Sequence, residues 1–421
     1  MAKLIRLENG LKVFYEKHAK SSAFALGVFI GAGSFFENKE NNGISHFIEH
    51  TVFKGTETRT AFDIADEADS CGVIINAYTS RNLTAFYTIG LAEYAEKCAD
   101  ILSDILFRST FTEENLEKEK GVVIEEIKMY EDDTEDVCLE NLIKAHYGNK
   151  PVSYSILGSK ENVRSFTRED ILDYMKRYYR AENACVSVVG NMSEEEAVNL
   201  VKKYFAFPTY DDNLVLPKLK TAAPKGKYVK KIKPLEQSAV GISFPAYPYK
   251  HKKRFLPMIV SNILGGGMSS RLFQEVREKN GLVYEIYSTV NQYDANAFFI
   301  VYFGTTPSQV CTAVKKVSET LDKALKEGFS EAEFKKAMAQ FKTAMVFGGE
   351  SASDVMRTGG RNGLIGKLVT PESILKEVSS YTLEDVNAAV KDIIKFDKAS
   401  LSYVGKKTDC DLLKVLLEDR I

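Results

Sequence analysis

Two histidines and a glutamate within five residues are the side chains of this sequence best suited to metal chemistry. They occur in His46-Phe47-Ile48-Glu49-His50, and the whole chain holds only five histidines. On a helix, His46 and His50 are four residues apart, so their imidazoles share one face and can grip the same cation. Imidazole nitrogen suits zinc, and a carboxylate between two such ligands suits a general base. The segment therefore predicts a zinc site with Glu49 as the base beside it.

A catalytic zinc needs a third protein ligand and one open position. The acidic segment 117–127 offers the candidates. Glu119 and Glu126 are seven residues apart, so two helical turns place them on one face, whereas Glu125 points about 100° away. The apolar residues of the later turns indicate partial burial, and a buried carboxylate needs a partner such as a metal. Glu119 and Glu126 are therefore the candidates for the remaining ligand.

The elements that carry these residues belong to a long, weak internal repeat. Similar segments recur in the same order at offsets between 209 and 218 residues: 72–80 with 281–288, 111–114 with 329–332, 166–170 with 381–385, and 188–190 with 403–405. Pairs of strand-like runs are followed by helix-like runs in both copies, a pattern typical of the α+β class. We therefore predict two similar domains related by internal duplication, each a mainly antiparallel sheet packed with helices. The predicted borders are 1–212 for the first domain, 213–232 for a proline-containing linker and 233–421 for the second domain.

The proposed ligands occur in only one copy of the repeat. Aligning Phe111 with Phe329 pairs Glu119 with Ala337 and Glu126 with Ala344, and the second half has no H-x-x-E-H segment. This asymmetry predicts a chemical site grafted on the first copy of a shared fold.

Composition excludes several other classes of protein. The 421 residues contain 56 Lys plus Arg and 58 Asp plus Glu, a net charge of −2, which argues against a nucleic-acid partner or a membrane-surface protein. The sequence contains no apolar run of about 18 residues, so it predicts no membrane span. Asn9-Gly10 between two short strand-like runs predicts a hairpin near the N-terminus, where a targeting peptide would lie, so we expect a cytoplasmic protein. The six cysteines lie far apart without C-x-x-C spacing, and we expect them to be reduced thiols.

The order H-x-x-E-H, which inverts the zincin motif, and Glu126, 76 residues after His50, resemble the pitrilysin/insulinase family of zinc metallopeptidases. The resemblance continues through segments 53–56, 76–79, 270–273 and 277–284 and covers nearly the whole chain. The size is similar to that of the short subfamily, which includes bacterial peptidases and the β subunit of the mitochondrial processing peptidase. The resemblance implies that His46, His50 and Glu126 bind Zn2+, that Glu49 deprotonates the attacking water, and that Glu119 orients a ligand histidine.

The resemblance also implies how a peptide substrate binds. Residues 73–79 would form an edge strand to which the peptide adds, with Asn76 and Ala77 beside it. Phe53 would help to form a side-chain pocket. Each residue has a structural alternative, since Phe53 could be a core aromatic and Asn76 a strand-end or bulge residue.

Arg277 and Tyr284 match family residues that contact the substrate carbonyl and the developing oxyanion. Their structural alternatives are a surface helix residue and a core strand residue. In the short subfamily two subunits close around the substrate, which implies a homodimer or heterodimer in which this pair acts in trans. The function implied is a zinc-dependent metalloendopeptidase that cuts peptides or unfolded segments in a closed dimer chamber. The alternatives are a non-catalytic partner or scaffold subunit of the same fold and a presequence processing peptidase.

Overall fold

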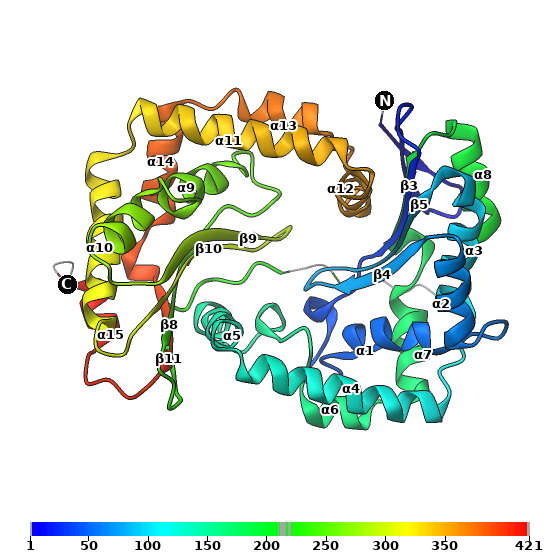
Figure 1. Cartoon of the computed structure of the whole chain (residues 1–421), viewed down its shortest axis with the longest axis horizontal. Helices are drawn as coiled ribbons and strands as arrows, with labels where there is room; N and C mark the ends of the chain where they lie inside the picture. Colours follow the sequence, from blue (N-terminus) through cyan, green and yellow to red (C-terminus); the bar gives the residue numbers. More distant parts are fainter. Residues whose placement is uncertain (1, 209, 211–215, 218–219, 419–421) are drawn as a thin grey trace. The chain divides into compact units, whose positions relative to one another are not determined.

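The computed structural model describes residues 2–208, 210, 216–217 and 220–418, which form two compact units. The first unit comprises Met1–Ile127, Tyr154–Lys218 and Ala344–Ile374. The second comprises Lys128–Ser153, Leu219–Thr343 and Leu375–Ile421. Each unit is built around one sheet that is covered by helices (Figure 1).

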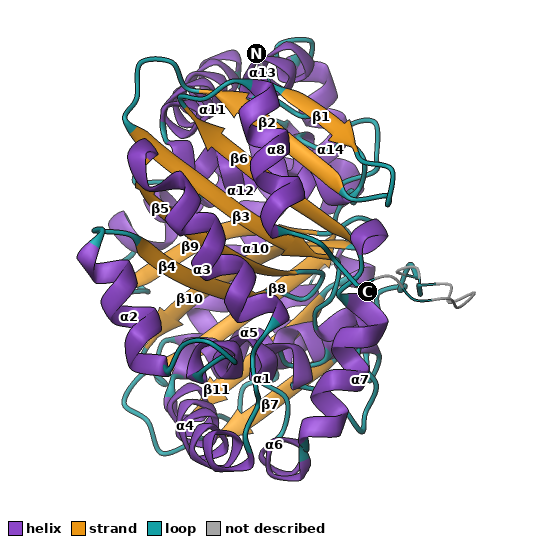
Figure 2. Ribbon diagram, turned by 90° about the vertical axis from the view of Figure 1, so that its right-hand side faces the viewer, coloured by secondary structure: helices purple, strands orange, loops and turns teal. Residues whose placement is uncertain are grey.

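The first unit contains a six-stranded sheet in the order β1-β2-β6-β3-β5-β4, whose strands run side by side (Figure 2). Its strands are β1 (Lys3–Arg6), β2 (Lys12–Lys17), β3 (Ala23–Ile30), β4 (Ile74–Thr79), β5 (Thr84–Leu91) and β6 (Ala184–Gly190). Its helices are α1 (Ile44–Thr51), α2 (Ala61–Ser70), α3 (Ala95–Phe107), most of α4 (Glu113–Asp132), α6 (Lys160–Ser165), α7 (Arg168–Tyr178), α8 (Glu194–Tyr204) and α12 (Ala352–Leu364). The predicted N-terminal hairpin is confirmed, because β1 pairs antiparallel with β2.

The second unit contains a five-stranded sheet in the order β7-β11-β8-β10-β9. Its strands are β7 (Tyr228–Ile232), β8 (Ser238–Pro245), β9 (Glu285–Gln292), β10 (Ala297–Thr305) and β11 (Ser400–Gly405). Its helices are α5 (Thr134–Tyr147), α9 (Leu256–Gly265), α10 (Val310–Glu327), most of α11 (Glu331–Glu350), α14 (Leu383–Ile393) and α15 (Leu412–Leu417), while α13 (Pro371–Val378) crosses the border between the units.

The two sheets confirm the predicted fold class and its duplication. Strands β2, β6, β3, β5 and β4 follow the same order as β7, β11, β8, β10 and β9. In each sheet one pair is parallel, β2–β6 and β7–β11, and the other pairs are antiparallel. Helices α4 and α11 have 20 residues each, and α7 and α14 both begin with a Thr–Asp capping box, at Thr167 and Thr382. The repeat in the sequence is therefore a repeat of structure.

The strands of the first sheet send alternate side chains to two separate cores. On β3, Leu26 and Val28 join the core that also contains residues of α1, α3, α7 and α8, whereas Ala25 and Phe29 face Val355 and Met356 of α12. Helix α12 lies on one side of β3 and β5, and α3 and α8 lie on the other (Figure 1). The sheet thus has an α1 face, which carries the metal-site helix, and an α12 face.

The compact units do not follow the contiguous domain borders that the sequence suggested. Each unit includes one helix from the other half of the chain. Helix α5, from the first half of the chain, packs on β11 and β8 of the second sheet, and α12, from the second half, packs on β6, β3 and β2 of the first. The sequence did not predict this exchange. The apolar face of an amphipathic helix indicates that the helix packs on an apolar surface, but it does not indicate which surface. Within the predicted linker, 228–232 form strand β7, while 213–215 and 218–219 lie outside the described residues.

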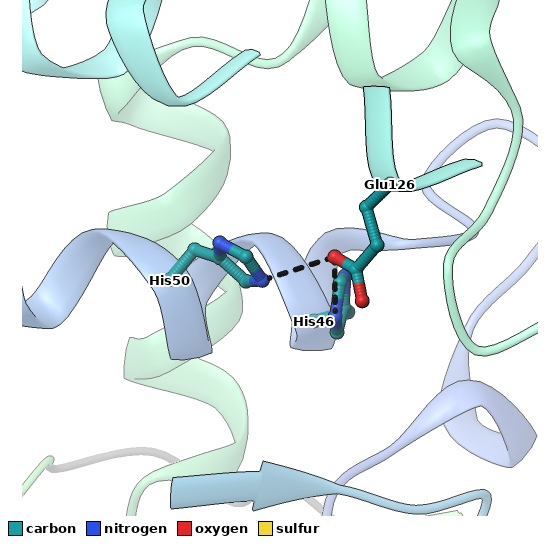
Figure 3. Close-up of side chains that lie close together, drawn as sticks. All are labelled: His46, His50 and Glu126. Carbon is teal, nitrogen blue, oxygen red and sulfur yellow. Dashed lines mark ion pairs between the residues drawn. The ribbon is translucent and has the colours of Figure 1, made fainter. Parts of the chain in front are cut away.

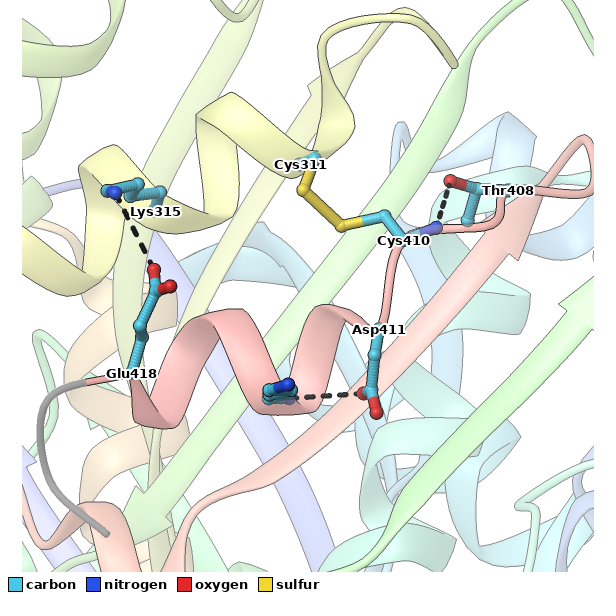
Figure 4. The surroundings of a disulfide bond; sticks show 7 residues. Cys311, Lys315, Thr408, Cys410, Asp411 and Glu418 are labelled. Carbon is cyan, nitrogen blue, oxygen red and sulfur yellow. Dashed lines mark hydrogen bonds and ion pairs between the residues drawn. A yellow bond between two sulfur atoms is a disulfide. The ribbon is translucent and has the colours of Figure 1, made fainter.

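The expectation that all six cysteines are reduced is wrong for one pair. Cys311 in α10 and Cys410 before α15 form a disulfide across 99 residues of sequence, with the Lys315–Glu418 ion pair beside it (Figure 4). Packing of α15 along α10 brings the two thiols together, and such a pairing leaves no spacing pattern in the sequence. Four cysteines are free thiols: Cys71, Cys98, Cys138 and Cys185.

In the described part of the chain, no helix combines the length and the apolarity that crossing a bilayer requires. The two 20-residue helices, α4 and α11, are both interrupted by charged residues.

Candidate metal centre

The histidine-bearing helix α1 begins at a turn that only glycine fits. The N-cap Gly43 has φ of 103°, and a Cβ on it would lie 2.8 Å from the backbone of Leu157 and Gly158. The buried Glu37 carboxylate then accepts hydrogen bonds from the backbone N–H groups of Gly43 and Ser45, at 2.8 and 3.0 Å. An anionic group at this end satisfies the free N–H groups of the first turn and interacts favourably with the helix dipole. These contacts hold the start of the helix that carries His46 and His50.

Helix α4 brings a carboxylate to both histidines (Figure 3). Glu126 Oε2 lies 3.6 Å from His46 Nε2 and 3.3 Å from His50 Nε2. One donor atom of each residue lies within 4.8 Å of the others. Two ligands that each bind a tetrahedral zinc ion at about 2.1 Å stand about 3.4 Å apart, so these separations suit a shared cation.

The polar atoms of the cluster also indicate a missing positive charge. Glu126 Oε2 and His46 Nδ1 are buried, and no hydrogen-bond partner satisfies either atom. A buried carboxylate oxygen without a hydrogen-bond donor is costly unless a cation binds it. The donor set of two imidazole nitrogens and one carboxylate oxygen is the set that zinc takes in catalytic sites, which leaves the fourth position open. The residues present therefore fit a zinc ion.

The protonation of the two histidines reflects their different surroundings. Burial, together with the neighbouring His50, lowers the pKa of His46. Burial also opposes the charge on His50, but Glu119 and Glu126 outweigh it and raise its pKa to about 9. The pKa of Glu126 is lowered, chiefly by its contact with His50.

Glu119 lies behind His50, on the side away from Glu126. Its Oε2 is 3.4 Å from His50 Nδ1, and its Oε1 accepts a 2.8 Å contact from Lys54 Nζ. Burial would raise the pKa of Glu119, but His50 and Lys54 outweigh it and lower that pKa. A carboxylate on the second nitrogen of a metal-binding histidine fixes the orientation of its ring. Glu125, one residue before Glu126, is exposed and lies outside the cluster.

The candidate base Glu49 is held by a residue that the sequence reasoning did not single out. The hydroxyl of Thr79, at the end of β4, donates a 2.5 Å hydrogen bond to Glu49 Oε2. Burial raises the pKa of Glu49, while Thr79 and His50 act in the opposite direction. The alternation along β4 was the available signal, because Ile75 and Ala77 pack on the α1 face and Thr79 follows in the same row.

The predicted substrate residues occupy two different units. Asn76 and Ala77 lie on β4, the edge strand of the first sheet, where the Asn76 side chain accepts a hydrogen bond from the backbone N–H of Ala77. Phe53 follows α1 and is partly buried against the core of the α1 face.

Arg277 and Tyr284 belong to the second unit. The Arg277 guanidinium lies 5.9 Å from the centre of the Tyr284 ring, and Tyr284 is 76% exposed. The exposure of Tyr284 argues against its alternative interpretation as a core residue.

Comparison with known proteins agrees with this fold, and the relatives are named as zinc proteases. The model of the family described as "Insulinase (Peptidase family M16)" matches residues 12–160, and the "Peptidase M16 inactive domain" matches residues 165–341. The chain is 36% identical over 400 residues to "Uncharacterized zinc protease YmxG" of Bacillus subtilis, which covers 95% of this chain and 97% of the relative. It is 31% identical over 409 residues to "Uncharacterized zinc protease Rv2782c" of Mycobacterium tuberculosis, covering 95% of this chain and 93% of that protein.

Solved structures share the fold across nearly the whole chain. A protease from Helicobacter pylori superposes with a TM-score of 0.89 at 21% identity, covering 96% of this chain and 99% of that one. An M16 inactive-domain protein from Pseudomonas fluorescens superposes with a TM-score of 0.89 at 20% identity, covering 97% and 98%. The chain has the two-domain fold of these structures, as the resemblance in the sequence indicated. The chain belongs to the insulinase family, peptidase family M16.

Proposed function

We propose that this protein is a zinc-dependent metalloendopeptidase that hydrolyses peptides or unfolded polypeptide segments. One observation carries the proposal: two imidazole nitrogens and one buried carboxylate oxygen converge at separations of 3.3 and 3.6 Å, which suit a single cation. The family membership and the names of the zinc-protease relatives support it.

The residues of the first unit divide the chemical work. Zinc, when held by His46, His50 and Glu126, would act as a Lewis acid and make water a nucleophile near neutral pH. Glu49 accepts the proton of the attacking water and returns it to the departing amine. Thr79 holds the Glu49 carboxylate in place through its hydroxyl.

The edge strand β4 supports an extended mode of substrate binding. A strand at the edge of a sheet offers unpaired backbone N–H and C=O groups to a peptide, and these contacts tolerate many sequences. Asn76 and Ala77 would lie beside the added strand, with Phe53 contributing to a side-chain pocket.

We further propose that two subunits enclose the substrate, either as a homodimer or with a related chain. Arg277 and Tyr284 would then stabilise the oxyanion from the second domain of the partner. Mixing Glu49→Gln subunits with Tyr284→Phe subunits should restore part of the activity. Absence of rescue at every mixing ratio would refute action in trans.

The substitution Glu49→Gln tests the hydrolytic role directly. The variant should retain zinc, because all three ligands stay, and should lose peptide hydrolysis, because the base is gone. A variant that still turns over substrate would remove Glu49 from its role. If the unmodified protein binds zinc and yet hydrolyses none of a broad set of unfolded peptides, the non-catalytic subunit is the better account. Cleavage restricted to targeting presequences would identify a processing peptidase instead.

The cytoplasmic location stays a prediction. The Cys311–Cys410 disulfide removes the reduced cysteines as an argument for it.

A further inference from the structure

Helix α12 holds two arginines over the face of the first sheet opposite the metal centre. Its glycines pack directly on the strands: a Cβ on Gly359 or Gly360 would lie 2.2 or 2.1 Å from the rings of Phe14 and Phe29. Such close contact leaves the helix no room to shift on the sheet. Arg357 and Arg361 are four residues apart on α12, so they project from the same side of this fixed helix.

One of the two arginines, Arg357, lies over β5, the strand that pairs with the edge strand β4. The Arg357 guanidinium is 5.1 Å from the centre of the Tyr87 ring, and Tyr87 on β5 pairs in register with Asn76 on β4. The Tyr78 ring on β4 lies 6.3 Å from the Tyr87 ring. Burial raises the pKa of Tyr78, and the charges of Arg361 and Arg357 oppose that rise, which agrees with their position near this strand.

The pleat of β4 determines which substrate side chains would meet these arginines. Thr79 and Ala77 face α1 and Glu49, whereas Tyr78 belongs to the core on the α12 face. Side chains of a peptide added to β4 would alternate in the same way. Every second side chain would therefore face the metal centre, and those between would face α12.

The charged residues of α12 itself have a net positive charge. Arg357 and Arg361 contribute two guanidinium groups, and Asp354, 3.3 Å from Arg357 Nη1, contributes one carboxylate. Arg357 is 40% exposed, so a ligand can reach it, and its stacking on Tyr87 holds it in place. Guanidinium groups bind carboxylates through paired hydrogen bonds.

We infer that Arg357 and Arg361 form a subsite that selects peptides with Glu or Asp at alternate positions along the strand added to β4. The inference rests on the proposed peptidase function and names the substrate class of that same site. It assigns to α12, a helix from the second half of the chain, a role in specificity within the first unit.

The experiment compares matched peptides with Glu or Gln scanned one position at a time. Binding is measured by fluorescence anisotropy to the Glu49→Gln protein, and hydrolysis is measured with the unmodified enzyme. Glu should strengthen binding about three- to fivefold at positions of one parity and have no effect at the positions between. The preference should shrink as salt is raised, and it should vanish in the Arg357→Gln/Arg361→Gln double variant. The variant Lys20→Gln/Lys202→Gln, which loses the same charge from other elements of the first unit, should keep it.

Each outcome separates the inference from the proposed function. Hydrolysis of the matched Glu and Gln peptides without any preference for Glu overturns the inference and leaves the proposed peptidase function intact. A Glu preference that persists in the double variant has the same consequence. A salt-sensitive Glu preference in binding, with no hydrolysis of either peptide by the unmodified enzyme, supports the subsite and overturns the peptidase. Failure of all the peptides to bind overturns the subsite. If the double variant does not fold, the salt dependence of peptide binding to the Glu49→Gln protein tests the subsite instead.

Discussion

Replacing Thr79 by Val removes the hydrogen bond that holds the candidate base and keeps the shape of the side chain. The Thr79 hydroxyl donates to Glu49 Oε2 at 2.5 Å, and Val is isosteric with Thr apart from this hydroxyl. A hydrogen bond to a charged group contributes about 1.5 to 3 kcal/mol. Glu49 is only partly buried, so water takes up part of the loss and the lower figure applies. About 1.4 kcal/mol corresponds to a tenfold change in rate, so kcat should fall roughly tenfold.

The assay is steady-state hydrolysis of a fluorogenic peptide by the zinc-loaded variant, with zinc content measured on the same sample. Zinc content should not change, because Thr79 does not contact the candidate ligands, and the loss should appear in kcat more than in KM. Thr79→Ser is the matched control, since it keeps the hydroxyl and should recover most of the rate. If Thr79→Val matches the unmodified enzyme, or if Thr79→Ser is as slow as Thr79→Val, the hydrogen bond does not position the base.

Three further predictions concern other parts of the molecule. Glu126→Gln should lower the zinc content of the purified protein while Glu125→Gln leaves it unchanged, and equal zinc content in both variants would exclude Glu126 as a ligand. Burial lowers the pKa of His146 to about 4, below its value of about 6.5 in the unfolded chain, so stability should be lost as the pH falls from 6.5 towards 4. In urea unfolding, the loss of stability between pH 7 and pH 5 should be about 2 kcal/mol smaller in His146→Gln than in the unmodified protein, and an equal loss in both proteins would contradict this account. Alkylation of the urea-unfolded protein should label four cysteines before reduction and six after it, whereas six before reduction would exclude the Cys311–Cys410 disulfide in the purified protein.

Local sequence patterns predicted the parts of the site that depend on helix geometry. The four-residue spacing of His46 and His50 and the seven-residue spacing of Glu119 and Glu126 predicted one face each, and both pairs lie in helices with these faces towards the cluster. The internal repeat predicted two similar sheets because duplication preserves the order of strands and helices. The same comparison indicated that only the first copy carries the donor set.

Contacts between distant segments were beyond the reach of that reasoning. The bond from Thr79 to Glu49 joins a strand end to a helix, and the contact of Lys54 with Glu119 joins a turn to another helix. The exchange of α5 and α12 depends on which sheet each apolar helix face meets, and many apolar faces satisfy the same pattern. These features are set by the packing of the whole unit, so periodicity along the chain does not reveal them.

The most direct test of the central claim is metal analysis of the purified protein together with peptide hydrolysis before and after chelation. We expect about one zinc per chain, loss of hydrolysis when a chelator removes it, and recovery of activity when zinc is restored. Hydrolysis that persists in metal-free protein, or failure of the protein to retain zinc when it is supplied, would contradict the account.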